Sequence, residues 1–163
     1  MSGHPAWFIT GTDTEIGKTF VACALLHAFR RNGWRAVAMK PIAAGCDEHG
    51  INDDVERLLA ASSFAPPRQL VNPYCFRAAI APHIAAVEEG RRIELPVIAA
   101  AFAGLRRLAD MVLVEGVGGF CVPLDDATDT ADLAALLDLP PILVVGMRLG
   151  CINHALLTAQ AIA

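Results

Sequence analysis

The sequence lacks the features that mark membrane, secreted and nucleic-acid-binding proteins. No apolar run reaches the roughly 18–20 residues needed to cross a bilayer; the longest, residues 97–114, is interrupted by Arg106, Arg107 and Asp110. The N-terminus has no basic segment followed by an apolar stretch, so no secretory signal is expected. The formal net charge of −4 gives no reason to expect nucleic acid as a partner. We therefore expect a cytoplasmic protein with neither a membrane nor a nucleic-acid partner.

Cysteine is sparse and scattered. The five cysteines form no C-x-x-C pair, and their number is odd. A metal site made of thiolates needs clustered cysteines, which the spacing does not provide. Free cysteine is one of the most often buried residue types. We therefore expect reduced, mostly buried thiols at Cys23, Cys46, Cys75, Cys121 and Cys151.

Apolar patterning predicts strands and helices in alternation. Short apolar runs suit buried strands at residues 6–10, 35–40, 111–115 and 141–146. Helical spacing predicts helices at residues 18–32, 53–61, 95–109, 130–138 and 151–163. Residues 62–82 are rich in proline and turn residues and are expected to form a long connection with some local helix. Continuous apolar strands separated by helices predict a parallel sheet with helices on both faces.

The segment GTDTEIGKT at residues 11–19 lies between the first strand and the first helix. A P-loop needs this context, because backbone N–H groups and the helix N-terminus then converge on an anion. Lys18 would offset the charge of the β- and γ-phosphates, and Thr19 would place its hydroxyl on Mg²⁺. Thr12 stands where the usual spacing has glycine, so the match is a variant; the alternative is a strand-to-helix turn with a chance Gly-Lys-Thr. The flanking elements favour an α/β, P-loop NTPase-like, three-layer domain over residues 1–163.

Charged residues follow two of the predicted strands, where ligands of open parallel sheets collect. Glu115 follows one strand and precedes Gly116-Val117-Gly118-Gly119; its carboxylate suits Mg²⁺, and the glycines allow close approach of a ligand. Lys40 follows another strand and suits a transferring phosphoryl group or an anionic substrate. The alternatives are a turn cap for Glu115 and a surface lysine for Lys40. Asp54 begins a helix, so it is either a helix-capping residue or a metal ligand.

Two further features carry weaker signals. His83 and His154 are isolated, and such histidines are more often structural than catalytic. The turn Arg148-Leu149-Gly150 leads into a helix that starts with Cys151-Ile152-Asn153, whose free N–H groups suit a carboxylate.

Together these motifs resemble the dethiobiotin synthetases, the ATP-dependent carboxylase–cyclases of biotin biosynthesis. The Gly-Thr-Asp-Thr start of the P-loop is typical of that family and explains Thr12. The resemblance covers essentially the whole chain, and beyond the P-loop it includes Lys40-Pro41-Ile42-Ala43, Val71-Asn72-Pro73-Tyr74, Ala81-Pro82-His83, residues 114–119 and residues 150–155.

The resemblance implies a reaction with ATP and Mg²⁺ as cofactors. An amine of 7,8-diaminopelargonate captures CO₂, supplied as CO₂ or bicarbonate, to give a carbamate. ATP then phosphorylates the carbamate to a carbamic–phosphoric anhydride, and the second amine closes the ureido ring of dethiobiotin. The family pattern makes Lys40 and Lys18 catalytic and assigns Mg²⁺ to Thr19, Asp54 and Glu115.

The resemblance also implies two binding sites. The nucleotide would contact Glu15, Ile16, Gly17, Lys18, Thr19, Phe20, Asp54, Glu115, Gly116, Val117 and Gly118. The substrate would contact Thr14, Lys40, Ala44, Gly150, Cys151, Ile152 and Asn153. The family works as a homodimer, in which the helix start at residues 149–153 of one subunit receives the substrate carboxylate bound to the other.

The chain departs from the family pattern at two places. Ala44 stands where the family usually has a hydroxyl residue that contacts substrate, so one hydrogen bond is expected to be missing or supplied by water. The family continues past the helix at residues 151–163 with further strands and the residues that recognise adenine. We therefore expect a C-terminally shortened chain.

Three alternatives remain. One is a related P-loop ligase of the cobyrinate synthetase type. The Lys40-Pro41 and Pro82-His83 segments favour the dethiobiotin synthetases over this class. Another is a partitioning or targeting ATPase that acts as a nucleotide-switched dimer. Those ATPases have a second lysine early in the loop, where this chain has Asp13, so the sequence argues against this alternative. The third is a nucleotide-binding module without catalytic activity.

Overall fold

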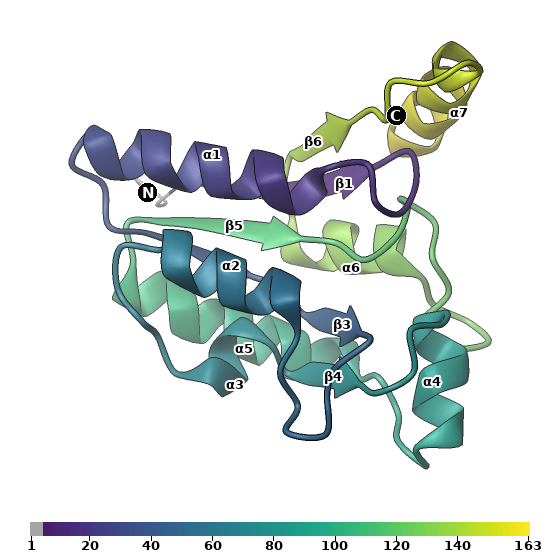
Figure 1. Cartoon of the computed structure of the whole chain (residues 1–163), viewed down its shortest axis with the longest axis horizontal. Coiled ribbons are helices and arrows are strands. Elements are labelled where there is room, and N and C mark those ends of the chain that lie inside the picture. Colours follow the sequence, from purple (N-terminus) through teal and green to yellow (C-terminus); the bar gives the residue numbers. More distant parts are fainter. Residues whose placement is uncertain (1–4) are drawn as a thin grey trace.

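The computed structural model describes residues 5–163 and contains a four-stranded, wholly parallel sheet. Residues 1–4, which the expected single domain includes, lie outside the described part. The strands run in the order β2 (Ala36–Met39), β5 (Met111–Glu115), β1 (Ala6–Gly11) and β6 (Pro141–Val144). Their carboxyl ends point to the same side of the molecule, on the right in Figure 1. The predicted α/β fold with a parallel sheet is confirmed.

Helices cover both faces of this sheet (Figure 1). Helices α1 (Lys18–Arg31) and α2 (Asp53–Ala61) pack on one face, and α5 (Leu95–Leu108) and α6 (Thr130–Leu137) pack on the other. Along β5, Met111 and Leu113 belong to one core while Val112 and Val114 belong to the other. All residues of β5 are buried, because both faces of the strand are covered. This explains why the strand reads as a continuous apolar run.

The nine predicted helices and strands are present, with ends that lie within two residues of the prediction. The last of them is α7 (Cys151–Ile162). Local chemistry sets the boundaries. The Asn52 side chain caps α2 by accepting hydrogen bonds from two backbone N–H groups, and Gly33 follows α1 with φ of 84°. Caps and positive-φ glycines of this kind can be read from the sequence, which is why the predicted ends agree.

The prediction of a long connection with some local helix at residues 62–82 is correct for the helix, but it misses a strand. This region holds α3 (Arg68–Val71) and β4 (Tyr74–Phe76), and α4 (Pro82–Glu88) begins at its end. Strand β4 pairs in parallel with β3 (Ile42–Ala44) to form a separate two-stranded sheet. Strands of three residues are too short to show a period of two, so patterning does not detect them.

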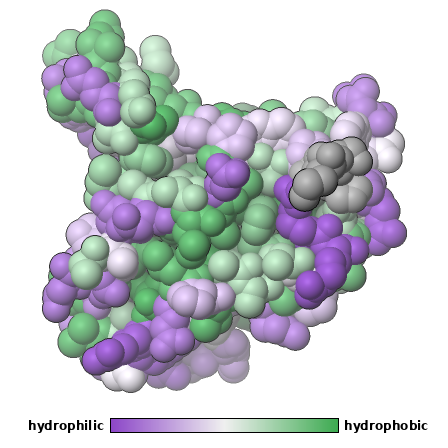
Figure 2. Space-filling model, turned by 180° about the vertical axis from the view of Figure 1, so that it is seen from behind, coloured by the Kyte–Doolittle hydropathy of each residue, from purple (hydrophilic) through white to green (hydrophobic). Residues whose placement is uncertain are grey.

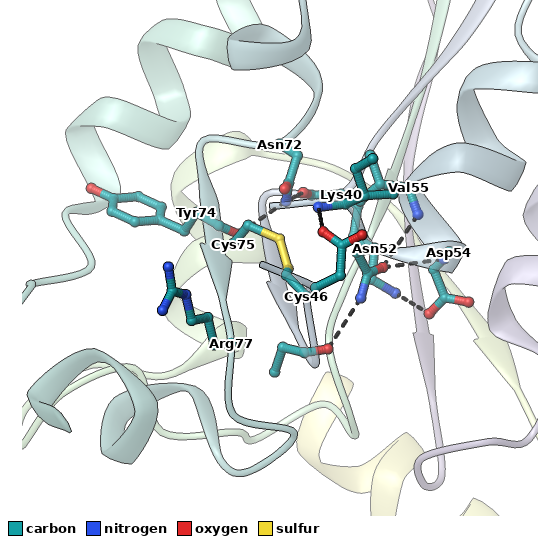
Figure 3. The surroundings of a disulfide bond; sticks show 12 residues. Lys40, Cys46, Asn52, Asp54, Val55, Asn72, Tyr74, Cys75 and Arg77 are labelled. Atoms are coloured by element: carbon teal, nitrogen blue, oxygen red, sulfur yellow. Dashed lines mark hydrogen bonds and ion pairs between the residues drawn. A yellow bond between two sulfur atoms is a disulfide. The ribbon is translucent and has the colours of Figure 1, made fainter. Parts of the chain in front are cut away.

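The expectation of reduced, mostly buried cysteines is also wrong. Cys46 and Cys75 form a disulfide, with their Cα atoms 6.2 Å apart (Figure 3). Cys121 is exposed, and Cys23 and Cys151 are partly exposed. The pairing of β3 with β4 brings Cys46 and Cys75 together across 29 residues of sequence. The positions of the cysteines in the sequence do not predict that they meet.

Helix α7 projects from the body beyond β6 (Figure 1). Figure 2, the view from behind, shows it as a knob at the upper left with much apolar surface. Large exposed apolar side chains on and before this helix are Met147, Leu149, Ile152, Leu156 and Leu157. Within residues 5–163, no helix is both long enough and apolar enough to cross a membrane.

Candidate active site

The P-loop connects β1, one of the two central strands, to the start of α1. Gly17 has φ of 97° and Glu15 has φ of 58°, so the loop curls back over the helix N-terminus. No side chain caps α1, and its first N–H groups therefore face the position where an anion would lie. Lys18 Nζ donates a hydrogen bond of 2.6 Å to the Asp13 carbonyl, across the concave side of the loop. This is the predicted geometry of a phosphate-binding loop.

Thr12 ties the P-loop to the neighbouring strand. Its N–H donates to the Val144 carbonyl at 3.1 Å, and its Oγ1 accepts from the Gly146 N–H at 3.2 Å. A glycine at position 12 would lose the second of these bonds. The variant residue therefore has a structural role in joining the loop to β6.

Lys40 lies at the centre of a charge cluster in which Lys40 and Glu115 are buried and the Asp54 side chain is 40% exposed. Its Nζ is 2.6 Å from Glu115 Oε1 and 2.8 Å from Asp54 Oδ2, and Thr19 Oγ1 donates to the same Glu115 oxygen at 2.8 Å. The side chains of Lys40 and Glu115 are only 6% and 1% exposed. Figure 3 shows Lys40 and Asp54 in this region, close to the disulfide.

The two lysines in the cluster region are the only lysines in the sequence, and their surroundings affect them in opposite directions. Burial by itself would lower the pKa of Lys40, but the Glu115 and Asp54 carboxylates outweigh it and raise this pKa. Burial, followed by the charge of Lys40, lowers the pKa of Lys18. Burial would raise the pKa of Asp54, but the ammonium of Lys40 outweighs it and holds this pKa below its usual value. Lys40 therefore keeps its positive charge at neutral pH.

The cluster also offers ligands for a divalent cation. Glu115 Oε2 is buried and has no hydrogen-bond partner among residues 5–163, which is unusual for a carboxylate oxygen. Thr19 and Asp54 lie beside it in the same cluster. No group of three or more His, Cys, Asp or Glu side chains suited to a metal occurs in the described part of the chain. A hydroxyl and two carboxylates fit Mg²⁺, which completes its shell with water and phosphate oxygens.

A cavity of about 880 Å³ joins the P-loop to this cluster. It brings together most of the predicted site residues: Thr14, Glu15, Gly17, Lys18, Thr19, Phe20, Lys40, Ala44, Asp54, Glu115, Val117 and Gly118. Ile16 and Gly116 do not line it. The Ile16 side chain packs against Gly11 and Gly146, and Gly116 packs against the Phe8 ring. Both residues therefore pack beneath the residues that line the cavity.

Other predicted residues lie elsewhere. Gly150, Cys151, Ile152 and Asn153 form the start of α7 and do not line the cavity of their own chain. This segment is nevertheless connected to the P-loop, since Arg148 Nη2 is 2.5 Å from Asp13 Oδ2. His83 lies on α4 and borders a different cavity, and His154 lies within α7.

The cavity also contains residues that the sequence reasoning missed. Arg57 lines it one helical turn after Asp54, a spacing that could have indicated a shared face of α2. Residues 79–82 line it as well, but they fell within the segment predicted as a long connection with some local helix. Their position depends on the start of α4, which has only a proline as a local signal.

The fold and the site define a P-loop nucleotide-binding α/β protein. A family model described as an AAA domain matches residues 6–163. The chain is 63% identical to the ATP-dependent dethiobiotin synthetase BioD of Aromatoleum aromaticum, in an alignment that covers all of this chain and 74% of that relative. The chain therefore belongs to the dethiobiotin synthetase family, as its motifs predict.

The packing of Ile16 leads to a testable prediction about the P-loop. A methyl group on Gly146 would overlap with the Ile16 side chain, so Gly146→Ala is expected to displace the loop and weaken Mg-ATP binding by about tenfold or more. Isothermal titration calorimetry measures this loss. The double variant Ile16→Ala/Gly146→Ala removes the overlap with Ile16 Cγ2 and leaves the Cβ of residue 16 at 3.0 Å, so it should regain part of the affinity. Equal weakening in the single and the double variant would contradict this role of Ile16.

Proposed function

We propose that this protein is an ATP-dependent dethiobiotin synthetase that acts in the cytoplasm, in biotin biosynthesis. It would convert 7,8-diaminopelargonate, CO₂ and ATP to dethiobiotin, ADP and phosphate. The observation that carries the proposal is the single cavity in which the P-loop Lys18 faces the Lys40–Glu115–Asp54 cluster. The 63% identical relative, which is named as an ATP-dependent dethiobiotin synthetase, supports the same reaction.

The positive charges in the cavity suit the first steps. An amine of the substrate adds to CO₂ and becomes a carbamate anion, which must approach the triphosphate of ATP. Two anions repel each other, and the effect is strong in a site that excludes water. Lys40 and Lys18 would offset this repulsion and the charge that develops as the γ-phosphoryl group moves to a carbamate oxygen.

Ring closure then needs no further cofactor. The second amine attacks the carbonyl carbon of the carbamic–phosphoric anhydride and forms the second C–N bond. The bond between that carbon and the bridging oxygen breaks, and phosphate leaves with the oxygen. Lys40 would stabilise the charge on the departing phosphate.

Mg²⁺ would be held by Thr19, Asp54 and Glu115. When bound, it neutralises charge on the β- and γ-phosphates. The unpartnered Glu115 Oε2 supports this role. Lys40 Nζ occupies the other Glu115 oxygen and one oxygen of Asp54, so the same two carboxylates would orient both the lysine and the metal.

Asp13 favours a ligase over a nucleotide switch. The switch ATPases that resemble this fold have a second lysine at this position. Here the residue is an aspartate whose side chain pairs with Arg148. A carboxylate at this place cannot replace the positive charge of such a lysine.

One assay tests the proposed reaction. Purified protein is incubated with 7,8-diaminopelargonate, bicarbonate, Mg²⁺ and ATP, and dethiobiotin and phosphate are measured together. The proposal predicts equal amounts of both products and phosphate release that requires the diamine. Phosphate release that does not depend on the diamine would indicate an ATPase and would overturn the proposal.

Lys40→Gln should lower kcat by about 10³-fold, because a charge aimed at the transferring group is lost. Because Glu115 loses its ion-pair partner, the variant is expected to be less stable. The number of nucleotide sites found by calorimetry gives the folded fraction, and kcat is calculated for that fraction. Arg107→Gln removes an exposed charge at the end of α5 and serves as the control. Comparable activity of Lys40→Gln and Arg107→Gln would remove Lys40 from the mechanism.

Glu115→Gln should raise the Mg²⁺ concentration needed for half-maximal ATP binding by about tenfold or more, since an amide is a poor replacement for a buried anionic ligand. Titration of ATP binding with Mg²⁺ measures the shift. Glu56→Gln is the matched control, because Glu56 lies on the surface of α2 and pairs with Arg68. An unchanged Mg²⁺ requirement in Glu115→Gln would contradict the proposed metal site.

We also propose that the protein acts as a homodimer with sites shared between subunits. Gly150, Cys151, Ile152 and Asn153 do not line the cavity of their own chain, yet their N–H groups open α7 without a side-chain cap. Such a helix start suits the carboxylate of a substrate bound to the other subunit. The exposed apolar side chains of α7 support burial against a second copy.

Shared sites predict complementation between two defective variants. Lys40→Gln removes the proposed catalytic lysine, and Cys151→Glu places a negative charge at the start of α7. Each variant alone should have little activity, but dimers re-formed from an equal mixture should recover about a quarter of wild-type activity, since one site in four then has both parts intact. No recovery in a mixture shown by mass spectrometry to contain heterodimers would contradict shared sites.

A further inference from the structure

The disulfide between Cys46 and Cys75 connects to the candidate active site through a short chain of contacts. Cys46 comes two residues after β3, and Cys75 is the middle residue of β4. The Cys46 N–H donates to the Phe76 carbonyl at 2.9 Å, so the backbone pairing of the two strands continues to the disulfide. In Figure 3, Asn52 lies between the disulfide and Asp54.

The small sheet that carries the disulfide is fastened at both ends. At one end, the Asn72 side chain donates to the carbonyls of Lys40 and Tyr74 at 2.6 and 3.0 Å. At the other end, the disulfide holds the strands together. A two-stranded sheet of three-residue strands is weak by itself. The covalent bond therefore adds to the hydrogen bonds from the Gly45 and Cys46 N–H groups, which also hold the segment that follows Ala44.

That segment leads directly to a proposed ligand of the site. One residue after Cys46, the Asp47 carboxylate accepts from the N–H groups of His49 and Ile51 and closes a tight turn. The next residue is Asn52, which caps α2 and also donates to the Ala44 carbonyl at 3.1 Å. Asp54 follows two residues later and pairs with Lys40. The disulfide closes a loop that contains all of α2, and thereby restrains both Ala44 and Asp54.

The two sulfurs differ in their access to other thiols. Cys46 is buried at 7% exposure, whereas Cys75 is partly exposed. Arg91 Nη1 donates to the Cys75 carbonyl at 2.9 Å, and its guanidinium lies over the Tyr74 and Phe76 rings. The more exposed Cys75 sulfur is therefore the one that an external thiol reaches first, because access is one of the factors that set the rate of disulfide exchange.

We propose that Cys46 and Cys75 form a reversible redox-modification site that controls the order of the substrate wall, defined as Ala44 and Asp54, which line the cavity, and Asn52, which joins them from behind. This inference rests on the proposed function, because the wall is part of the proposed synthetase site. The oxidised form holds the wall in place, and the reduced form releases it. Disulfides of cytosolic proteins are usually transient or redox-sensing, and the proposed cytoplasmic location suits this behaviour.

The disulfide forms and is reduced by thiol–disulfide exchange with external compounds. In oxidation, the Cys75 thiolate attacks a low-molecular-weight disulfide and releases one thiol. The Cys46 thiolate then attacks the mixed disulfide and releases the second thiol, so two electrons and two protons pass to the external disulfide. In reduction, one thiolate of an external dithiol attacks the Cys75 sulfur and Cys46 leaves as the thiolate. The second thiol of the dithiol then resolves the mixed disulfide.

The first experiment measures order without turnover. The full chain is equilibrated with glutathione disulfide or with a dithiol, alkylated to count free thiols by mass spectrometry, and followed by amide hydrogen exchange. The oxidised protein should contain a linked Cys46–Cys75 peptide pair. Amides 47–55 should exchange about tenfold faster or more after reduction, while amides 112–114 of the buried strand β5 remain unchanged. Free thiols at both positions in the oxidising buffer, or equal exchange in both states, would overturn the proposal.

Variants separate the disulfide from other thiol effects. The double variant Cys46→Ser/Cys75→Ser should exchange like the reduced protein in both buffers. Cys121→Ser removes an exposed cysteine outside the described site and should keep the full response. A redox response that persists in the double variant would contradict the assignment to this pair.

The second experiment measures the effect on the site. Reduction should raise the KM for the diamine by about tenfold, because Ala44 lines the cavity. It should also raise the Mg²⁺ concentration needed for half-maximal activity, because Asp54 is a proposed metal ligand. The same KM in both states would overturn the regulatory role. The hydrogen-exchange experiment tests the redox inference without measuring turnover. Absence of dethiobiotin in both the oxidised and the reduced state would therefore count against the proposed function alone.

Discussion

The buried ion pair between Lys40 and Glu115 is the interaction on which the rest of the site depends. Lys40 directly follows β2 and Glu115 ends β5, and the register that pairs Met39 with Val114 places them side by side. Neither charge is tolerable alone in an environment with about 1–6% exposure, because an unpaired buried ion is strongly destabilising. The order of the sheet and the charge of the site therefore require each other.

The other parts of the site attach to this pair. Helix α1 brings Thr19 to Glu115, and helix α2 brings Asp54 to Lys40. The P-loop on the adjacent strand β1 then lies across the cavity from the cluster. Its close packing depends on glycines beside Ile16, and its attachment to β6 depends on Thr12. The small β3–β4 sheet supports the opposite wall, where the disulfide acts.

Sequence patterning was sufficient where local chemistry determines position. Lys40, Asp54 and Glu115 were identified because each follows a strand or begins a helix, and the structure brings all three together. It was insufficient where a feature depends on distant contacts. The pairing of β3 with β4 and the disulfide arise from segments about 30 residues apart, and three-residue strands have no visible period. Ile16 and Gly116 belong to the right loops but face the protein interior, a distinction that only packing reveals.

The most direct test of the central claim follows an oxygen atom. If ATP phosphorylates a carbamate, the bridging oxygen of the anhydride comes from CO₂ and leaves with phosphate. The reaction is run briefly with ¹⁸O-labelled bicarbonate, and ³¹P NMR detects the isotope shift of the released phosphate. The proposed mechanism predicts one labelled oxygen in phosphate for each dethiobiotin formed, after correction for exchange of bicarbonate with water. Phosphate that carries oxygen from water only would contradict it.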